Sequence, residues 1–166
     1  MTETGLWLRY RLLLFSTVAV LVFDQVTKLW VVGSFRLYES IPLIENFLAF
    51  TYVRNKGAAF GILSDSSWRI PFFIGIGLVA VVVILVFYHK TAMDHRFTRF
   101  GLALILPGAV GNLIDRIRMG EVIDFIDAHW YQYHWPAFNV ADSAITIGVG
   151  CLLLASLFLP EGRDTK

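Results

Sequence analysis

The sequence predicts a membrane protein of the all-α class, with a bundle of four transmembrane helices and a small β-structure outside the bilayer. Hydrophobic residues make up 57% of its 166 residues and charged residues only 16%, whereas soluble domains usually carry about 25% charged residues. The apolar residues also gather in four long blocks. Too few polar residues remain to cover four such helices in water, so a bilayer is the expected surrounding.

Each block is close to the length that a helix needs to cross a bilayer core, which is about 20 residues with a range of about 17–25. The second block carries no charge over 19 residues and spans unaided, while the third and fourth are uncharged over 15 and 17 residues. These two therefore need polar ends near the lipid headgroups. One domain, residues 1–166, is expected to contain spans at residues 12–32, 70–88, 100–118 and 142–159.

Positive charges indicate how the bundle is oriented. Three Lys or Arg residues lie within residues 89–99, and Arg9 and Arg11 precede the first span. The positive-inside rule therefore places both termini in the cytoplasm. Loops 33–69 and 119–141 are expected outside, although they also carry Lys and Arg.

The outer loops have the composition of β-structure and of a membrane interface. Residues 46–53 (NFLAFTYV) are rich in aromatic and β-favouring side chains, which predicts a strand, and residues 35–41 alternate loosely and are expected to pair with it. Four aromatic residues lie within residues 130–135. Such clustering is typical of the boundary between membrane and water.

Polar residues are expected to gather at one end of the bundle. They lie near the outer ends of three predicted spans: Asp24 and Lys28 in the first, Asn112, Asp115 and Arg116 in the third, and Asn139 and Asp142 at the fourth. Polar groups at membrane depth are costly and usually functional. A transporter or channel needs polar groups along its whole path, so a one-sided cluster favours chemistry at the interface instead.

Two of these groups favour a structural role. Asp24 and Lys28 are four residues apart on one helix face, so an ion pair that anchors the first span is expected. Gly108, Asn112 and Asp115 share a face of the third span, and a small residue such as Gly108 lets membrane helices approach closely. The pattern leaves open whether Asp115 and its neighbour Arg116 are structural or face a substrate.

Asp124 and Asp142 form the candidate catalytic pair. Asp124 follows the third span in an apolar VIDF run, and Asp142 lies at the mouth of the fourth span. Taken singly, they suit a solvated loop carboxylate and an N-cap. Taken together near one surface, they suit two carboxyl groups that share a proton. The ionised group would activate water, and the protonated group would donate to a scissile carbonyl.

Other chemistries find less support in the sequence. It contains no H-E-x-x-H zinc signature and no G-x-S-x-G nucleophile motif. His129 and His134 have no ligand spacing that indicates a metal site, so neither a metal nor an organic cofactor is expected. A net charge of +1 without a basic stripe excludes a nucleic-acid partner.

Five motifs, in order along the chain, resemble those of the lipoprotein signal peptidase family, also called type II signal peptidase. They are DQVTK at residues 24–28, NKGAAF at 55–60, GNLIDR at 111–116, VIDF at 122–125 and FNVADS at 138–143. The resemblance implies an aspartic endopeptidase of the bacterial cytoplasmic membrane, with its active site near the outer face. Such enzymes remove the signal peptide of diacylglyceryl-modified prolipoproteins and cut just before the lipidated cysteine.

The resemblance also implies roles for single residues. The catalytic pair would be Asp124 and Asp142, the substrate-binding residues Asn55, Asn112, Arg116 and Asn139, and the supporting residues Asp24, Lys28, Gly108 and Asp115. Membrane lipids and globomycin-type inhibitors are the further implied partners, the outer loops would form a β-cradle and a lid, and a monomer is expected. Two alternatives remain open: a non-enzymatic membrane module, such as a transporter subunit or scaffold, and a lipid-handling enzyme that uses the same carboxylates.

Overall fold

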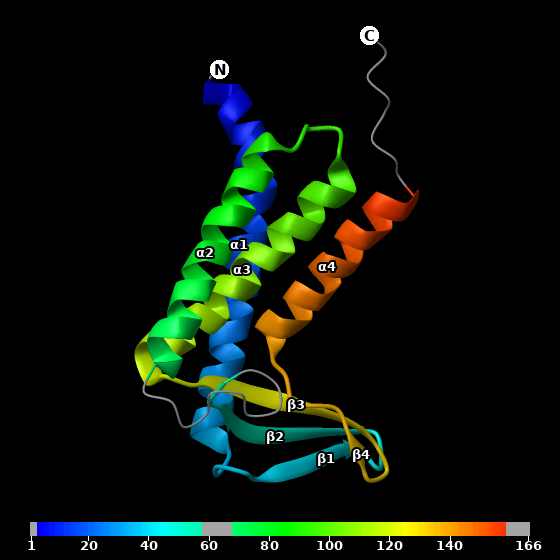
Figure 1. Ribbon diagram of the computed structural model, residues 1–166. Coiled ribbons are helices and arrows are strands. Elements are labelled where there is room, and N and C mark those ends of the chain that lie inside the picture. Colours follow the sequence, from blue (N-terminus) through cyan, green and yellow to red (C-terminus); the bar gives the residue numbers. More distant parts are fainter. Residues whose placement is uncertain (1–2, 58–67, 159–166) are drawn as a thin grey trace.

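The computed structural model describes residues 3–57 and 68–158, and in these residues a helical bundle stands on a small sheet (Figure 1). Its helices are α1 (Glu3–Ser34), α2 (Arg69–Lys90), α3 (Arg96–Met119) and α4 (Val140–Phe158). Each is long and apolar enough to cross a membrane. Its strands are β1 (Ser40–Ile44), β2 (Leu48–Asn55), β3 (Val122–Trp130) and β4 (Tyr133–His134). The predicted fold class is therefore confirmed.

The helices extend past the predicted apolar blocks because charged residues at a span's end can continue a helix into the headgroup region. The first helix, for example, begins well before residue 12. Helix α3 ends where Gly120 adopts a left-handed φ of 72° and its N–H donates to the carbonyl of Arg116. Glycine adopts this conformation without strain, and it turns the chain from α3 into β3.

The strands form one antiparallel series in the order β1-β2-β3-β4. Strand β2 confirms the predicted strand. The expected partner segment 35–41 is confirmed at its C-terminal end, where Ser40 and Ile41 of β1 pair with Thr51 and Phe50, although β1 begins only at Ser40. The pairing of β2 with β3 sets Val53 opposite Asp124 and Asn55 opposite Val122. This register brings the end of β2 beside the start of β3.

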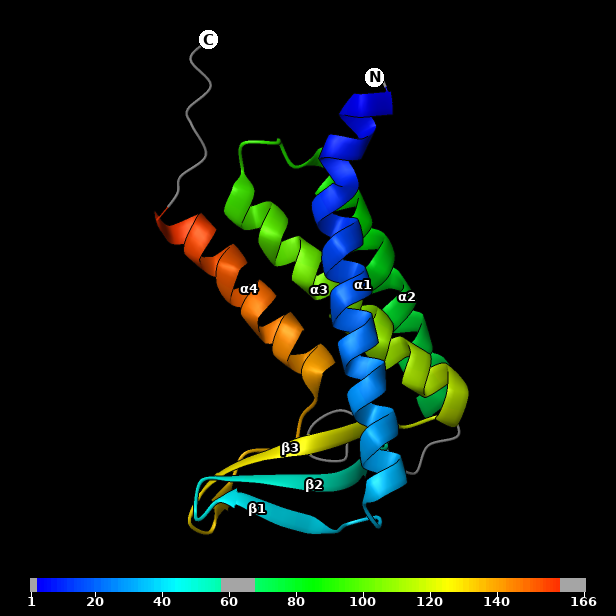
Figure 2. The same ribbon diagram turned by 180° about the vertical axis from the view of Figure 1, so that it is seen from behind.

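The sheet is fixed to the bundle by a buried apolar cluster. Val31 of α1 packs with Tyr52 of β2 and with Ile123 and Phe125 of β3, and all four are at most 4% exposed. Figures 1 and 2 show the sheet lying across the end of the bundle at which α1 and α3 end and α4 begins. The opposite end holds the start of α1 and the α2–α3 connection. The sheet therefore meets the membrane at one surface.

Helix α3 lies at the centre of the bundle and packs against the other three helices. Its contact with α4 is close because glycines replace side chains at the crossing. A Cβ atom on Gly148 would lie 2.6 Å from the carbonyl oxygen of Gly101, and one on Gly101 would lie 2.7 Å from that of Gly148. Close backbone approach through small residues is typical of membrane helices.

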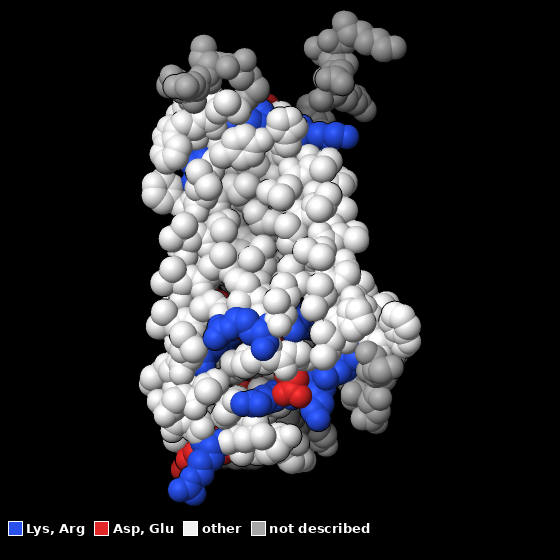
Figure 3. All heavy atoms as spheres, turned by 90° about the vertical axis from the view of Figure 1, so that its left-hand side faces the viewer, with Lys and Arg blue, Asp and Glu red and all other residues white. Residues whose placement is uncertain are grey.

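The outward face of the bundle is apolar. Figure 3 shows one side of the molecule, with an uncharged central belt and with Lys and Arg atoms towards its two ends. Large exposed side chains such as Phe15, Val79 and Leu157 lie on the outer faces of three different helices. A surface of this kind is stable in lipid rather than in water, as expected for a membrane protein.

Replacing Gly148 by Ala should destabilise the bundle, because the added methyl group meets backbone atoms that cannot rotate away. We expect a loss of about 1–3 kcal/mol, as for other overpacked sites. Gly150, on the same helix, has open space where its Cβ would lie. Gly150→Ala should therefore cause no loss. Thermal unfolding of both variants in detergent checks this, and equal midpoints would contradict the packing argument.

Candidate active site

The polar residues singled out in the sequence meet at the sheet end of the bundle. They come from α1 (Asp24, Lys28), β2 (Asn55), α3 (Asn112, Asp115, Arg116), β3 (Asp124) and the start of α4 (Asn139, Asp142). Hydrogen bonds, ion pairs or electrostatic interactions connect them into one cluster. The predicted gathering of polar groups is therefore present, although the motifs are far apart in sequence.

Asp124 is held by two asparagine side chains. Its Oδ1 accepts a hydrogen bond of 2.7 Å from Nδ2 of Asn139, and its Oδ2 accepts one of 3.0 Å from Nδ2 of Asn55. The residue is only 2% exposed. Asn55 can reach it because the strand register places the end of β2 beside the start of β3.

Asp142 belongs to the capping arrangement of α4. Asn139 precedes the helix, and its Oδ1 accepts from the backbone N–H of Asp142 at 2.9 Å. In return, Oδ2 of Asp142 accepts from the N–H of Asn139 at 3.3 Å. This reciprocal pair is a capping box. The suggestion that Asp142 is itself the N-cap is therefore wrong, because Asn139 occupies that position.

Asn139 connects the two aspartates. Its side-chain oxygen holds the backbone of Asp142, and its side-chain nitrogen donates to Asp124. The same nitrogen lies 3.2 Å from Oδ1 of Asn112, whose own Nδ2 donates to Oδ1 of Asp142 at 2.7 Å. Asn139 is fully buried. The carboxyl groups of Asp124 and Asp142 are thus fixed by one continuous amide network.

The surroundings raise the pKa of Asp124 to about 7. Burial is the largest cause, because it penalises the charged form, and the negative charge of Asp142 adds to it. The hydrogen bonds from Asn55 and Asn139 act in the opposite direction, because they favour the carboxylate. Burial and the neighbouring carboxylate thus favour the protonated form of Asp124.

A buried ammonium group pairs with two further acidic residues next to this pair. Nζ of Lys28 lies 2.8 Å from Oδ2 of Asp24 and 2.8 Å from Oδ2 of Asp115, and it donates to Oδ1 of Asn112 at 3.2 Å. All of these residues are buried. The predicted ion pair between Asp24 and Lys28 is confirmed, and Asp115 proves to be its third member.

The two carboxylates that pair with Lys28 also hold the backbone around the site. Oδ1 of Asp24 accepts from the N–H of Ala141 at 3.0 Å, which ties α1 to the first turn of α4. Oδ2 of Asp115 lies 3.4 Å from the N–H of Ile123, beside Asp124 in β3. Asp24 and Asp115 therefore position the segments that carry Asp124 and Asp142.

Close helix packing is needed for these contacts. A Cβ on Gly108 would lie 2.5 Å from the carbonyl oxygen of Ala141. A Cβ on Gly111 would lie 2.7 Å from Oδ2 of Asp24. Close helix approach was expected at these small residues of the third span, and the structure shows it at both. Gly111 belongs to the GNLIDR motif.

Gln25 belongs to the site although it was not among the predicted site residues. Its Nε2 lies 3.1 Å from Oδ2 of Asp24 and 3.1 Å from Oδ1 of Asp115, so its amide joins the ion cluster around Lys28. A polar side chain next to Asp24 in the first span was the available signal. In the NKGAAF motif, residues 58–60 lie outside the described part of the chain, as do residues 61–67 of the same loop.

Arg116 lies at the edge of the cluster. Its guanidinium stacks over the ring of Phe73 with 5.1 Å between the charged carbon and the ring centroid, and it donates weakly to the carbonyl of Asn112 at 3.4 Å. It is partly exposed. Among the residues that the structure describes, most of its five N–H donors have no hydrogen-bond partner, so they can face a bound molecule.

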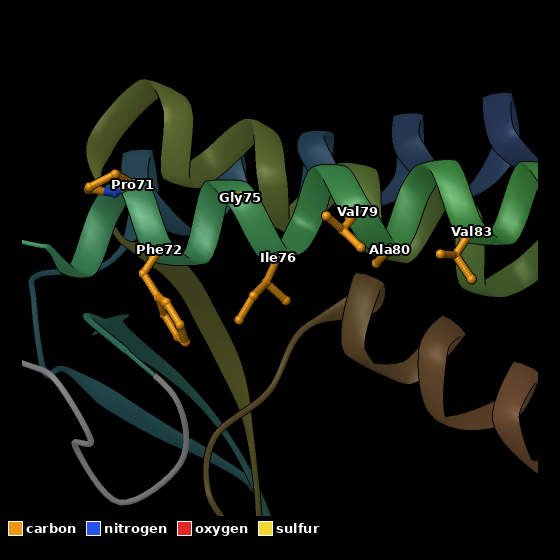
Figure 4. A pocket seen from close by; sticks show the side chains of 7 residues that line it. All are labelled: Pro71, Phe72, Gly75, Ile76, Val79, Ala80 and Val83. Carbon is orange, nitrogen blue, oxygen red and sulfur yellow. The ribbon is translucent and has the colours of Figure 1, made fainter.

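An apolar groove of about 540 Å³ runs along α2. Figure 4 shows the side chains of Phe72, Ile76, Val79 and Val83 pointing from α2 towards the side on which the sheet and the start of α4 lie. None of the polar cluster residues lines the groove. It is an open apolar surface of α2 rather than a pocket around the aspartates.

Comparison with known proteins decides which family has this arrangement. The family model described as signal peptidase (SPase) II matches residues 16–158. The chain belongs to the signal peptidase II family. It is therefore a membrane peptidase, and the resemblance inferred from the five motifs is confirmed.

Individual relatives agree with this assignment. The chain is 54% identical over 147 residues to a lipoprotein signal peptidase of Syntrophotalea carbinolica, covering 89% of this chain and 91% of that protein. It is 50% identical over 157 residues to one of Geobacter metallireducens, covering 95% and 96%. A bacterial membrane enzyme solved by the in meso method at 2.3 Å resolution has a TM-score of 0.80 and 36% identity, covering 93% and 94%.

Replacing Lys28 by Met should destabilise this signal peptidase II strongly. The change leaves Asp24 and Asp115 buried without their cation, and breaking a buried ion pair costs about 3–5 kcal/mol. Lys56→Met removes an exposed lysine and serves as the control. Thermal unfolding in detergent measures both variants. Similar midpoints for Lys28→Met and wild type would show that the buried cation contributes little.

Proposed function

We propose that this chain removes the signal peptides of diacylglyceryl-modified prolipoproteins, cutting just before the lipidated cysteine, with Asp124 and Asp142 as the catalytic pair. The observation that supports it most directly is the amide network of Asn139, which links both carboxyl groups. Relatives about 50% identical to this chain are named lipoprotein signal peptidases. An aspartic endopeptidase uses two neighbouring carboxyl groups that share a proton, and here hydrogen bonds from one amide network hold both groups.

The two aspartates would share one proton during the reaction. The ionised carboxylate takes a proton from water, whose oxygen attacks the scissile carbonyl carbon, while the protonated carboxyl group donates its proton to the carbonyl oxygen. The tetrahedral intermediate then breaks its C–N bond. The leaving amine receives a proton from one aspartate, and one hydroxyl of the intermediate returns its proton to the other aspartate as the carbonyl of the new acid forms. The pair is then singly protonated again.

We assign the three asparagines first to positioning this pair. The amide nitrogens of Asn55, Asn112 and Asn139 each donate to one of the aspartates, so these bonds fix the direction of both carboxyl groups. Asn55 and Asn112 each have a second amide hydrogen, because an amide carries two donors. Contact between these asparagines and the peptide backbone of the substrate remains a prediction.

Arg116 is the residue best suited to bind substrate directly. It is partly exposed beside the amide network, and its planar group offers several donors for a peptide carbonyl or a lipid ester. We infer that the apolar part of the signal peptide lies along the groove on α2, because that groove is lined by apolar side chains. Globomycin-type inhibitors would then compete for the same surface.

The site is proposed to lie near the outer face of the bacterial cytoplasmic membrane. The start of α1 and the α2–α3 connection share the end of the bundle opposite the sheet, and Arg9, Lys90, Arg96 and Arg99 lie there. Positive charges favour the cytoplasmic side. The sheet and the aspartates would consequently face outwards, where a translocated prolipoprotein presents its lipidated cysteine. Membrane lipids surround the helices, and the enzyme is expected to act as a monomer.

Asp124→Asn and Asp142→Asn should each abolish cleavage while the protein remains folded. Asparagine keeps the size of the side chain but can neither ionise nor pass on a proton. Because general acid–base groups contribute about 10²–10⁴-fold, we expect kcat to fall by at least about a hundredfold. Cleavage of a lipidated prolipopeptide by purified protein in detergent measures the effect.

Asp94→Asn is the matched control for these variants, because the side chain of Asp94 is 84% exposed between α2 and α3. It should cleave at the wild-type rate. Retained cleavage by either dyad variant, with an unchanged unfolding midpoint, would rule out the proposed pair. An unlipidated peptide tested in parallel shows whether the diacylglyceryl group is required.

Cleavage should decline as pH rises above about 7, because Asp124 then loses the proton that the pair must keep. Asn55→Ala removes a hydrogen bond that favours the carboxylate. The pKa of Asp124 should therefore rise further, and the alkaline limb of the kcat/KM profile should move to higher pH. Lys56→Ala, at the neighbouring exposed position, should leave the limb in place. A limb that moves to lower pH in Asn55→Ala would contradict this assignment.

A further inference from the structure

A second cluster of ionisable side chains lies at the β3–β4 hairpin, apart from the aspartate pair. Asp127 and His129 belong to β3, and His134 belongs to β4. One ligand atom from each of the three side chains lies within 4.8 Å of the other two. Figure 1 shows β4 beside the end of β3 that is farther from α3, so the cluster is separated from the start of β3, where Asp124 lies.

The strand register creates this cluster. His129 and His134 are direct partners across the hairpin, so their side chains leave the same face at close distance. Their rings stack with 4.6 Å between centroids and 18° between planes. Asp127 is two residues before His129, so it projects from the same face of β3. The spacing of these three residues along the chain shows no metal-ligand pattern, but the hairpin brings their side chains together as a compact set of donors.

The donors also face one another. Nδ1 of His134 lies 2.9 Å and 3.0 Å from the two carboxylate oxygens of Asp127. Nδ1 of His129 lies 3.7 Å from Oδ2 of the same carboxylate. Two ligands of a tetrahedral zinc ion are about 3.4 Å apart, since each lies about 2.0–2.2 Å from the metal. Only small side-chain rotations would be needed to enclose an ion.

Their exposure suits a site that is fixed on one side and open on the other. The side chains of Asp127 and His129 are 15% and 11% exposed, whereas that of His134 is 53% exposed. Strand β3 is held firmly here, because the N–H of His129 donates to the carbonyl of Phe47 at 2.9 Å. Strand β4 has only two residues. Two ligands therefore lie on a fixed strand and the third on a short one.

We propose that Asp127, His129 and His134 bind a divalent transition-metal ion, with Zn²⁺ as the best match. Two imidazole nitrogens and one carboxylate oxygen are a zinc donor set, and water can complete the tetrahedron. The bound ion joins β4 to β3 across the hairpin. It stabilises the end of the sheet and takes no part in peptide-bond cleavage.

Zn²⁺ titration of the full-length protein in detergent, without a histidine tag, tests the site. We expect one ion per chain by calorimetry. Asp127→Asn, His129→Gln and His134→Gln should each weaken Zn²⁺ binding by at least about tenfold. The loss of a residue that only hydrogen-bonds to a metal ligand already costs about 10–100-fold in metal affinity, and the loss of a ligand should cost no less. His95→Gln, in the α2–α3 connection, is the control and should bind as wild type does. Co²⁺ in place of Zn²⁺ should give visible absorption bands that His134→Gln lacks.

Hydrogen exchange supplies a readout that does not depend on folding of every variant. Zn²⁺ should slow exchange of the amides in residues 130–135 of the wild type, and not in His134→Gln, whose half-exposed side chain can be replaced without disturbing the core. Equal Zn²⁺ affinity in wild type and His134→Gln would overturn the proposal. So would a loss of binding in His95→Gln as large as in the hairpin variants, or no binding by the wild type.

Discussion

The arrangement of this peptidase depends on one buried cation. Lys28 is 1% exposed, and its ammonium group contacts Asp24 of its own helix and Asp115 of α3. Charges at membrane depth are tolerated only when they are paired. Because Asp24 also accepts from the start of α4, and Asp115 lies within reach of the start of β3, a single ion-paired cluster joins three helices to the sheet. The cation thus lets acidic groups gather where water is scarce.

The proposed catalytic pair lies next to that cluster. Close approach of α3 and α4, which Gly108 permits, brings the start of α4 beside α3. The capping box then fixes Asn139 and Asp142 relative to each other. Asp124 belongs to β3, and its two carboxylate oxygens accept hydrogen bonds from the side-chain amides of Asn139 and Asn55. Burial raises its pKa to about 7, so the same packing that positions the carboxyl group also keeps a proton available at neutral pH.

Much of the site could be predicted from residue types and order. Asp24 and Lys28 are four apart on an apolar helix, a spacing that requires them to pair, and this was confirmed. The role of Asn139 was harder to see, because an asparagine before a helix predicts a cap but not a bridge to Asp124. The expected pairing of residues 35–41 was confirmed only at the C-terminal end of that segment, since a loosely alternating segment contains no information about where pairing begins.

The sequence by itself determined that the chain crosses a membrane four times, that its polar residues gather at one end and that its motifs are those of signal peptidase II. Hydrophobic length and residue order are local properties, so they can be read directly. Only the tertiary structure decided that Asn55 reaches Asp124 and that His129 stacks on His134. Both contacts depend on strand register, which is fixed by the packing of the whole sheet rather than by any local pattern.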